Sequence, residues 1–262
     1  MSVDEAAMLP AATNFDRRPA AWDADRSPGS LLVAWQNPDS RLISPVGLLE
    51  HGGEAGYRFR YLRRAPDVAG FRPFLSFPDW QRTYSSRHLF PLFSQRIMSP
   101  RRPDFGQFLR QLNLSEGATP WEQLARSEGR RTGDTVQVFP IPAVQPDRST
   151  TCRFLVHGIR HVTGGLFPKL DIGEELALQA DPANEVNPEA VLVCDRKGGR
   201  LGYVPDLLLD HLQALRRAGP IALTVEHLNG PETPAHLRLL ARLDGRAPLG
   251  YEPMTCPKWE TF

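Results

Sequence analysis

The first half of the chain alternates apolar and polar positions over short stretches, which is typical of strands with one buried face. In the clearest stretch, 57–62, aromatic residues at 57, 59 and 61 alternate with Arg58 and Arg60. Glycines at 52, 53 and 56 precede it and indicate a tight turn. We expect strands in this half at residues 31–36, 45–50, 57–62 and 133–141.

Helical spacing of apolar residues appears between the third and fourth of these strands. It predicts helices over 86–97, 103–112 and 119–127. The last has the strongest start signal, with Thr119 as N-cap, Pro120 in the first turn and Glu122 three residues after the cap. That combination predicts a capping box, in which side chains satisfy the free amide groups at the beginning of a helix.

The second half contains many short apolar runs separated by turn residues. They predict strands at 153–159, 174–181, 189–195, 200–204, 221–228 and 236–243. One helix is expected over 205–219, because Leu208, Leu212 and Leu215 share a face and Gly219 follows as a stop signal. Many short strands with one main helix indicate a small barrel.

The predicted fold class is therefore α+β. An N-terminal mixed sheet with helices is followed by a small β-barrel of OB- or SH3-like type with one main helix. We expect a disordered leader over 1–29, a first domain over 30–142, a linker over 143–150, a second domain over 151–245 and a C-terminal tail over 246–262.

Composition and charge exclude several classes of protein. The chain of 262 residues is 41% hydrophobic and 23% charged, as is usual for a folded protein. It has no run of about 18 apolar residues that would span a membrane, and its beginning lacks the apolar segment of a signal peptide. We therefore expect a cytoplasmic protein. The net charge of +1 argues against strong non-specific binding to duplex DNA.

Residues with catalytic or metal-binding chemistry do not form a recognisable constellation. The three cysteines are widely spaced, which argues against a structural zinc site, and Cys194 within an apolar run is expected to be buried. On the predicted strand, His157 and His161 lie too far apart to share a metal. No nucleophile and base have suitable spacing. We expect no enzyme activity, no metal and no cofactor.

Three stretches of the second half, "VHGIRHVTGG", "IGEELALQADPANEVNPEAVLV" and "GGRLGYVPDLLLDHLQAL", resemble the HIRAN domain over roughly residues 152–243. That family is a small barrel found beside some DNA-repair helicases and in bacterial proteins. The resemblance implies a site that holds a single-stranded 3′ end of DNA. An Arg–aromatic pair on the first strand and an aromatic–Asp pair in the polar loop would form it.

The chain departs from that pattern at several positions. It keeps Arg160 but has His161 where an aromatic residue often stands, and Val186 and Asn187 replace the aromatic–Asp pair. A missing aromatic residue removes a stacking platform worth about 1–3 kcal/mol per base. Asn187 can hydrogen-bond but offers no carboxylate to a terminal hydroxyl.

The first half resembles the N-terminal subdomain of HipA-type serine/threonine kinases over residues 30–142. The stretches that carry this resemblance are "VGLLEHGGEAGYRFRY", "RPFLSFP", "LFPLFSQRIMSPRR" and "PWEQLARSEGRRTGDTVQVFPIP". The catalytic core of such kinases is missing, because no phosphate-binding loop and no catalytic Asp–Asn pair follow.

Two hypotheses for function follow. In the first, the chain is a non-catalytic bacterial-type adaptor whose barrel binds single-stranded DNA or DNA ends, in DNA repair or phage defence. The expected nucleic-acid-binding residues are Arg160, His161, Asn184, Asn187 and Tyr203. Tyr203 would stack on a base and Arg160 would pair with a phosphate.

The alternative is a protein-interaction module. In this hypothesis the chain is an antitoxin-like partner that docks a separate HipA-like kinase. Phe90 and Phe93, at helical spacing, are the candidate docking residues. The slight acidic excess of residues 151–262 and the missing loop aromatics favour this alternative, whereas the retained Arg160 and Tyr203 favour nucleic-acid binding.

Overall fold

The computed structural model describes residues 29–131 and 133–262; the predicted leader therefore lies almost entirely outside the described residues. The first half forms one five-stranded sheet in the order β4-β3-β2-β1-β5. Its strands are β1 (Ser30–Gln36), β2 (Ile43–His51), β3 (Tyr57–Tyr61), β4 (Tyr84–Ser86) and β5 (Val136–Pro140). Every neighbouring pair is antiparallel, so the expectation of a mixed sheet is wrong. Short hairpins join β1, β2 and β3, and such links require antiparallel pairing.

An aromatic cluster fills one face of this sheet, as the alternation in β3 predicts. Phe59 and Tyr61 are fully buried. The Phe59 ring stacks on Phe77 with centroids 4.3 Å apart, and the Tyr61 hydroxyl donates a hydrogen bond of 2.9 Å to the Phe77 carbonyl. The hydroxyl is satisfied, so the large ring can be buried without leaving an unpaired polar group.

Three short helices follow in the first half: α1 (Pro91–Ser94), α2 (Phe105–Gln111) and α3 (Pro120–Arg126). The first is much shorter than predicted, because Phe90 precedes a proline and keeps an extended backbone. The third has the predicted capping box. The Thr119 hydroxyl accepts from the Glu122 amide at 3.2 Å, and the Glu122 carboxylate accepts from the Thr119 amide at 2.7 Å.

Phe90 and Phe93 belong to the aromatic core of the first half. Phe93 is fully buried and Phe90 nearly so. The Phe90 ring meets Phe77 edge-on at 5.0 Å, and Phe93 lies 6.2 Å from the same ring. The structure therefore places both residues inside the protein and not on the exposed docking face expected from the sequence. Helical spacing identifies a shared face but does not say what covers it.

The second half contains two three-stranded antiparallel sheets, ordered β10-β11-β6 and β7-β8-β9. Their strands are β6 (Ser149–Leu155), β7 (Ala177–Ala180), β8 (Val191–Cys194), β9 (Arg200–Tyr203), β10 (Ala222–Leu228) and β11 (Leu239–Arg246). Isolated bridges connect the two sheets, His157 with Tyr203 and Glu175 with Thr224. The α+β class is confirmed, but the predicted barrel is not shown closed.

The main helix of this half, α5 (Leu209–Ala218), follows the short 3-10 turn η4 (Asp206–Leu208), as the leucine spacing predicts. Leu212 and Leu215 are fully buried in the core of the two sheets. Cys152 and Cys194 are also buried, and the three cysteines form no disulfide.

His211 is a buried titratable group on α5. Its Nδ1 lies 3.2 Å from the Tyr251 hydroxyl, and among the described residues its Nε2 has no hydrogen-bond partner. Burial lowers the pKa of His211 to about 4. The folded pKa lies below the unfolded value of about 6.5, so the native state prefers the neutral ring. This stability is fully present above pH of about 6.5 and is lost as the pH falls toward 4.

We therefore expect the free energy of unfolding to fall by about 2 kcal/mol between pH 7.5 and pH 4.5 through this residue alone. Urea unfolding of the chain and of His211→Gln at both pH values measures the effect. The variant should lose less stability on acidification, whereas His88→Gln, at an exposed position, should behave like the parent. An equal loss in all three proteins would contradict the prediction.

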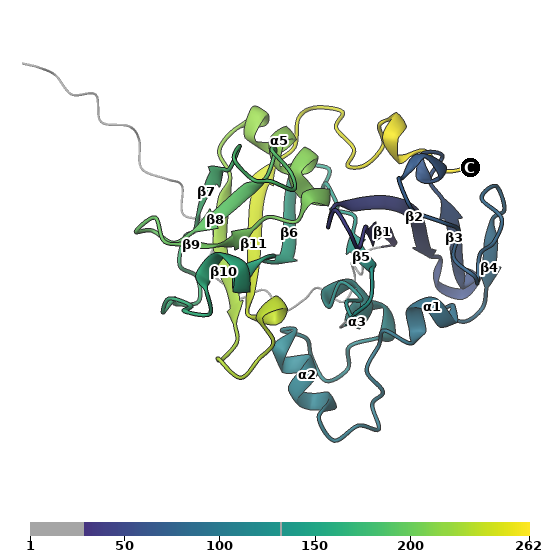
Figure 1. Ribbon diagram of the computed structural model, residues 1–262, viewed down its shortest axis with the longest axis horizontal. Helices are drawn as coiled ribbons and strands as arrows, with labels where there is room; N and C mark the ends of the chain where they lie inside the picture. The colour runs from purple at the N-terminus through teal and green to yellow at the C-terminus, as the bar shows by residue number, and fades with distance from the viewer. Residues whose placement is uncertain (1–28, 132) are drawn as a thin grey trace, which may run out of the picture.

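The C-terminal residues return to the sheet of the first half. Thr261 forms a bridge with Leu62, and the Phe262 amide donates to the Tyr61 carbonyl at 3.1 Å. Trp259 packs with Leu32 of the first half and Leu207 of the second. In Figure 1 the strands of the second half lie at the left and those of the first half at the right, and the C-terminal segment, in yellow, crosses between them along the top. The two halves therefore share buried contacts. Within the described residues, no helix is both long and apolar enough to cross a bilayer.

Candidate nucleic-acid interface

The polar loop 181–190 between β7 and β8 is an ordered turn. The Asp181 amide donates to the Ala190 carbonyl at 2.9 Å and closes its base. The side-chain oxygen of Asn184, Oδ1, accepts hydrogen bonds from the backbone amides of Val186 and Asn187, both at 3.0 Å. Asparagine side chains stabilise turns in this way. The Asn184 oxygen therefore shapes the loop, whatever else this residue contacts.

Asn187 connects the loop to η4. Its amide nitrogen donates to the Asp206 carboxylate at 2.9 Å, and its oxygen accepts from the Glu189 amide at 2.9 Å. Both ends of the side chain are therefore used within the protein. The structure gives Asn187 a clear structural role, and a ligand would have to compete for those hydrogen bonds. Val186 is 46% exposed and offers no ring for stacking.

Tyr203 ends β9, and its ring is half-buried. The hydroxyl donates to Asp181 Oδ2 at 2.8 Å, so the ring is tied to the base of the polar loop. Burial raises the pKa of Tyr203, and the Asp181 carboxylate raises it further, whereas the neighbouring Asn184 side chain and the charge of Arg200 lower it. Tyr203 is therefore a neutral, fixed ring at ordinary pH, as a stacking platform requires.

The segment after β6 pairs with Tyr203 through its backbone. The His157 amide donates to the Tyr203 carbonyl at 2.9 Å, and the Tyr203 amide donates to the His157 carbonyl at 2.8 Å. Gly202 permits this close approach, because a Cβ there would collide with the His157 carbonyl oxygen. Gly158 has φ of +67°, and a Cβ there would lie only 3.1 Å from the Tyr203 ring. A glycine adopts that backbone conformation at little cost.

Arg160 and His161 lie on α4 (Ile159–Thr163), a short helix that begins after Gly158. The sequence-based assignment of these residues to a strand is therefore wrong. The strand β6 ends at Leu155, and the left-handed Gly158 turns the chain into the helix. Ile159 is buried, whereas Arg160 and His161 are exposed. His157, by contrast, is largely buried beside the first half of the chain.

The structure brings Tyr203 and Asn184 together and places Arg160 and His161 on the helix that follows Gly158. Two residues near Tyr203, Asp181 and Arg200, were not expected from the sequence to belong to the site. Asp181 binds the Tyr203 hydroxyl, and Arg200 is exposed at the start of β9. Asp181 follows β7 directly, and β7 lies in the same sheet as β9, which carries Tyr203. That position is the sequence feature that could have identified Asp181. Among residues 29–131 and 133–262, no group of three or more His, Cys, Asp or Glu side chains is arranged to hold a metal ion.

Comparison with known proteins identifies the second half. Residues 149–239 match the HIRAN domain model and are a HIRAN domain, a family known to bind DNA. Nothing identifies the first half as HipA-like, and that resemblance stays a prediction. A search of curated proteins found no match. One similar solved structure is the crystal structure of the HIRAN domain of human HLTF, with 19% identity, a TM-score of 0.30, and coverage of 40% of this chain and 84% of that chain.

Proposed function

We propose, from the premise that residues 149–239 are a HIRAN domain, that this protein is a non-catalytic adaptor that binds single-stranded DNA or DNA ends. The binding surface is formed by residues 158–163, which include α4, by β9 from Arg200 to Tyr203 and by the loop 181–190, and is named the α4–Tyr203 face. The observation that carries the proposal is the neutral, half-buried ring of Tyr203, held by Asp181 and adjoining the helix that presents Arg160.

The chemistry of this face suits a single strand. A base can stack on Tyr203, because stacking on an aromatic side chain requires only an unpaired base with a free face. Arg160 and Arg200 are exposed cations that can contact phosphates. The loop also carries the carboxylates of Asp181, Glu185 and Glu189, which reduce the net positive charge of the α4–Tyr203 face. The affinity for DNA should therefore depend only weakly on salt concentration.

The salt dependence gives a quantitative prediction. If Arg160 and Arg200 each neutralise one phosphate, the plot of log affinity against log salt should have a slope of about −1.4 for a single strand. Replacing Arg160 by alanine should weaken binding and reduce the magnitude of the slope by about 0.7. Fluorescence anisotropy of a labelled short strand over a salt series measures both quantities.

Arg58→Ala is the matched control, since Arg58 is exposed on β3 in the other half of the chain. It should leave the affinity and the slope unchanged. Strands with free and blocked 3′ ends separate recognition of ends from binding along a strand. The proposal is rejected if the chain shows no binding at low salt, or if Arg58→Ala and Arg160→Ala have the same effect.

We propose no second function. The docking residues expected for the alternative, Phe90 and Phe93, lie in the core of the first half.

A further inference from the structure

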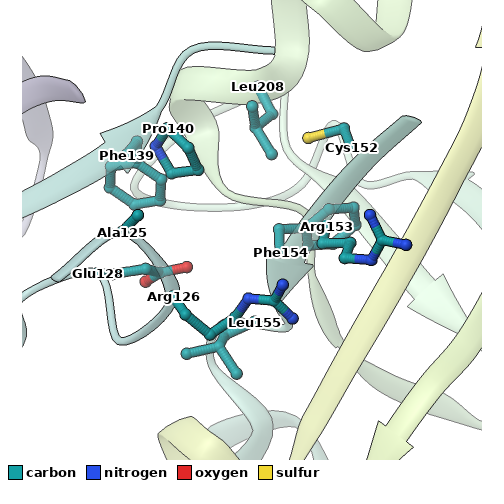
Figure 2. A pocket seen from close by; sticks show the side chains of 10 residues that line it. All are labelled: Ala125, Arg126, Glu128, Phe139, Pro140, Cys152, Arg153, Phe154, Leu155 and Leu208. Carbon is teal, nitrogen blue, oxygen red and sulfur yellow. The ribbon is translucent and has the colours of Figure 1, made fainter. Parts of the chain in front are cut away.

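The junction between the two halves contains a buried polar cluster that the proposed DNA site does not use. Figure 2 shows the side chains that line a small cavity at this junction, with Glu128 and Phe139 from the first half and Cys152 and Leu208 from the second. The cavity among them has a volume of only about 10 Å³, room for no more than about one water molecule. This region is a packed contact between the halves and has no space for a ligand.

Glu128 and His157 form a buried polar contact across this junction. Glu128 Oε2 lies 2.7 Å from His157 Nε2, and the side chains are only 3% and 12% exposed. Arg130 lies 3.9 Å from the same carboxylate oxygen. Burial and the charge of Arg130 lower the pKa of His236, and the Glu128 carboxylate opposes them, so His236 also lies close to this cluster. A hydrogen bond to a buried carboxylate is strong and directional.

The first half holds Glu128 in a fixed position. Its carbonyl accepts from the Val138 amide of β5 at 2.8 Å, which ties the residue to the five-stranded sheet. Its φ is +56°, so it lies in a tight turn with Gly129. The buried Arg96 donates to the Gly129 carbonyl at 3.0 Å and to the Val136 carbonyl at 3.2 Å, which fixes the other side of the turn.

The second half connects His157 directly to the DNA-binding face. The His157 backbone exchanges two hydrogen bonds with Tyr203, and the next residue, Gly158, leaves room for the Tyr203 ring and precedes α4 as its N-cap. Because Glu128 holds the His157 side chain, it also restrains the backbone at His157. That backbone pairs with Tyr203 and leads into the helix that carries Arg160. Hydrogen bonds and rigid strands of this kind can transmit a change of position between sites.

We propose that Glu128 is a positioning residue for the nucleic-acid site, through which the first half of the chain sets the geometry of the HIRAN domain. This inference rests on the proposed function, because the site that it positions is the α4–Tyr203 face. It assigns the first half a role in binding without any contact between that half and DNA.

The test begins with Glu128→Gln in the full chain. The substitution keeps the shape of the side chain and removes the charge from the hydrogen bond to His157. We expect the affinity for a labelled short single strand, measured by anisotropy, to fall about tenfold, which corresponds to about 1.4 kcal/mol. Glu226→Gln is the matched control, because Glu226 accepts a 2.8 Å bond from Arg153 with both side chains mostly buried inside the second half. It should leave the affinity within about twofold of the parent, the usual range for sites that do not couple.

A double-mutant cycle separates positioning from general destabilisation. If Glu128 acts through His157 and Tyr203, then Glu128→Gln should cost almost nothing further in a Tyr203→Ala background. Amide hydrogen exchange at His157 and Tyr203 should also be faster in Glu128→Gln without DNA, while exchange within β10 and β11 is unchanged. If Glu128→Gln does not fold, His157→Gln tests the same bond from the other side.

The outcomes are distinguishable from those of the proposed function. Parent-like affinity of Glu128→Gln, or full additivity with Tyr203→Ala, would overturn the positioning role while DNA binding stands. If the parent chain binds no DNA, the proposed function fails. Hydrogen exchange then still decides the structural claim, because unchanged exchange at His157 and Tyr203 would show that Glu128 does not hold this segment.

Discussion

Replacing Tyr203 by alanine is expected to weaken binding of a short single strand between about 5-fold and about 150-fold. The range corresponds to the loss of one base stack of about 1–3 kcal/mol. The ring is half-buried, neutral and held by a 2.8 Å hydrogen bond to Asp181. A fixed ring loses little conformational entropy when a base stacks on it, and the alanine variant lacks that platform. Fluorescence anisotropy at constant salt measures the loss.

Two control variants sharpen this prediction. Tyr203→Phe keeps the ring and removes only the bond to Asp181, so most of the affinity should be retained. Tyr84→Ala removes a partly buried tyrosine of β4, whose hydroxyl accepts from the Asp79 amide at 2.8 Å, from the other half of the chain. It should leave the affinity unchanged. Equal losses for Tyr203→Phe and Tyr203→Ala would show that the hydroxyl, and not the stacking surface, provides the binding energy.

Replacing Arg96 by alanine is expected to lower the free energy of unfolding by about 3–5 kcal/mol, the usual cost of breaking a buried ion pair. The Arg96 side chain is 3% exposed and bonds to Asp134 at 2.6 Å. It also donates to the carbonyls of Leu92, Gly129 and Val136. Burial lowers the pKa of Arg96, and the Asp134 carboxylate opposes the shift. The substitution removes this donor from the three carbonyls and from Asp134 Oδ2.

Urea unfolding measures this effect, and Arg102→Ala is the matched control. Arg102 also bonds a carboxylate, that of Asp104 at 2.8 Å, but the two side chains are 59% and 42% exposed. Exposed pairs contribute about 0–1 kcal/mol, so this variant should be nearly as stable as the parent. If Arg96→Ala lowers the free energy of unfolding by less than about 1 kcal/mol, Arg96 does not stabilise the turn at Glu128 and Gly129 as proposed.

The elements that follow from local chemistry could be predicted from the sequence. The capping box at Thr119, the alternation in β3 and the leucine face of α5 all depend on residues close together in the chain. The same holds for the HIRAN resemblance, which depends on short runs such as "GGRLGYVP" and is confirmed over residues 149–239. Periodicity was informative wherever an element spans several turns or alternations.

Elements that depend on one glycine or on distant contacts could not be predicted. In the sequence the apolar run of β6 continues to His157 without a break, but Gly158 ends the extended path and α4 is too short to show helical periodicity. Asp181 was not expected, because its role arises from pairing across the sheet. Glu128 meets His157 only when the two halves pack together. Local pattern carries no information about such contacts.

A titration of the isotopically labelled chain with a short single strand, followed by amide chemical shifts, would locate the DNA-binding surface residue by residue. We expect the largest shifts at residues 158–163, 181–190 and 200–203, which form the α4–Tyr203 face, with smaller shifts at His157 and Glu128. Shifts confined to residues 30–142, or none at a saturating concentration of DNA, would contradict this expectation.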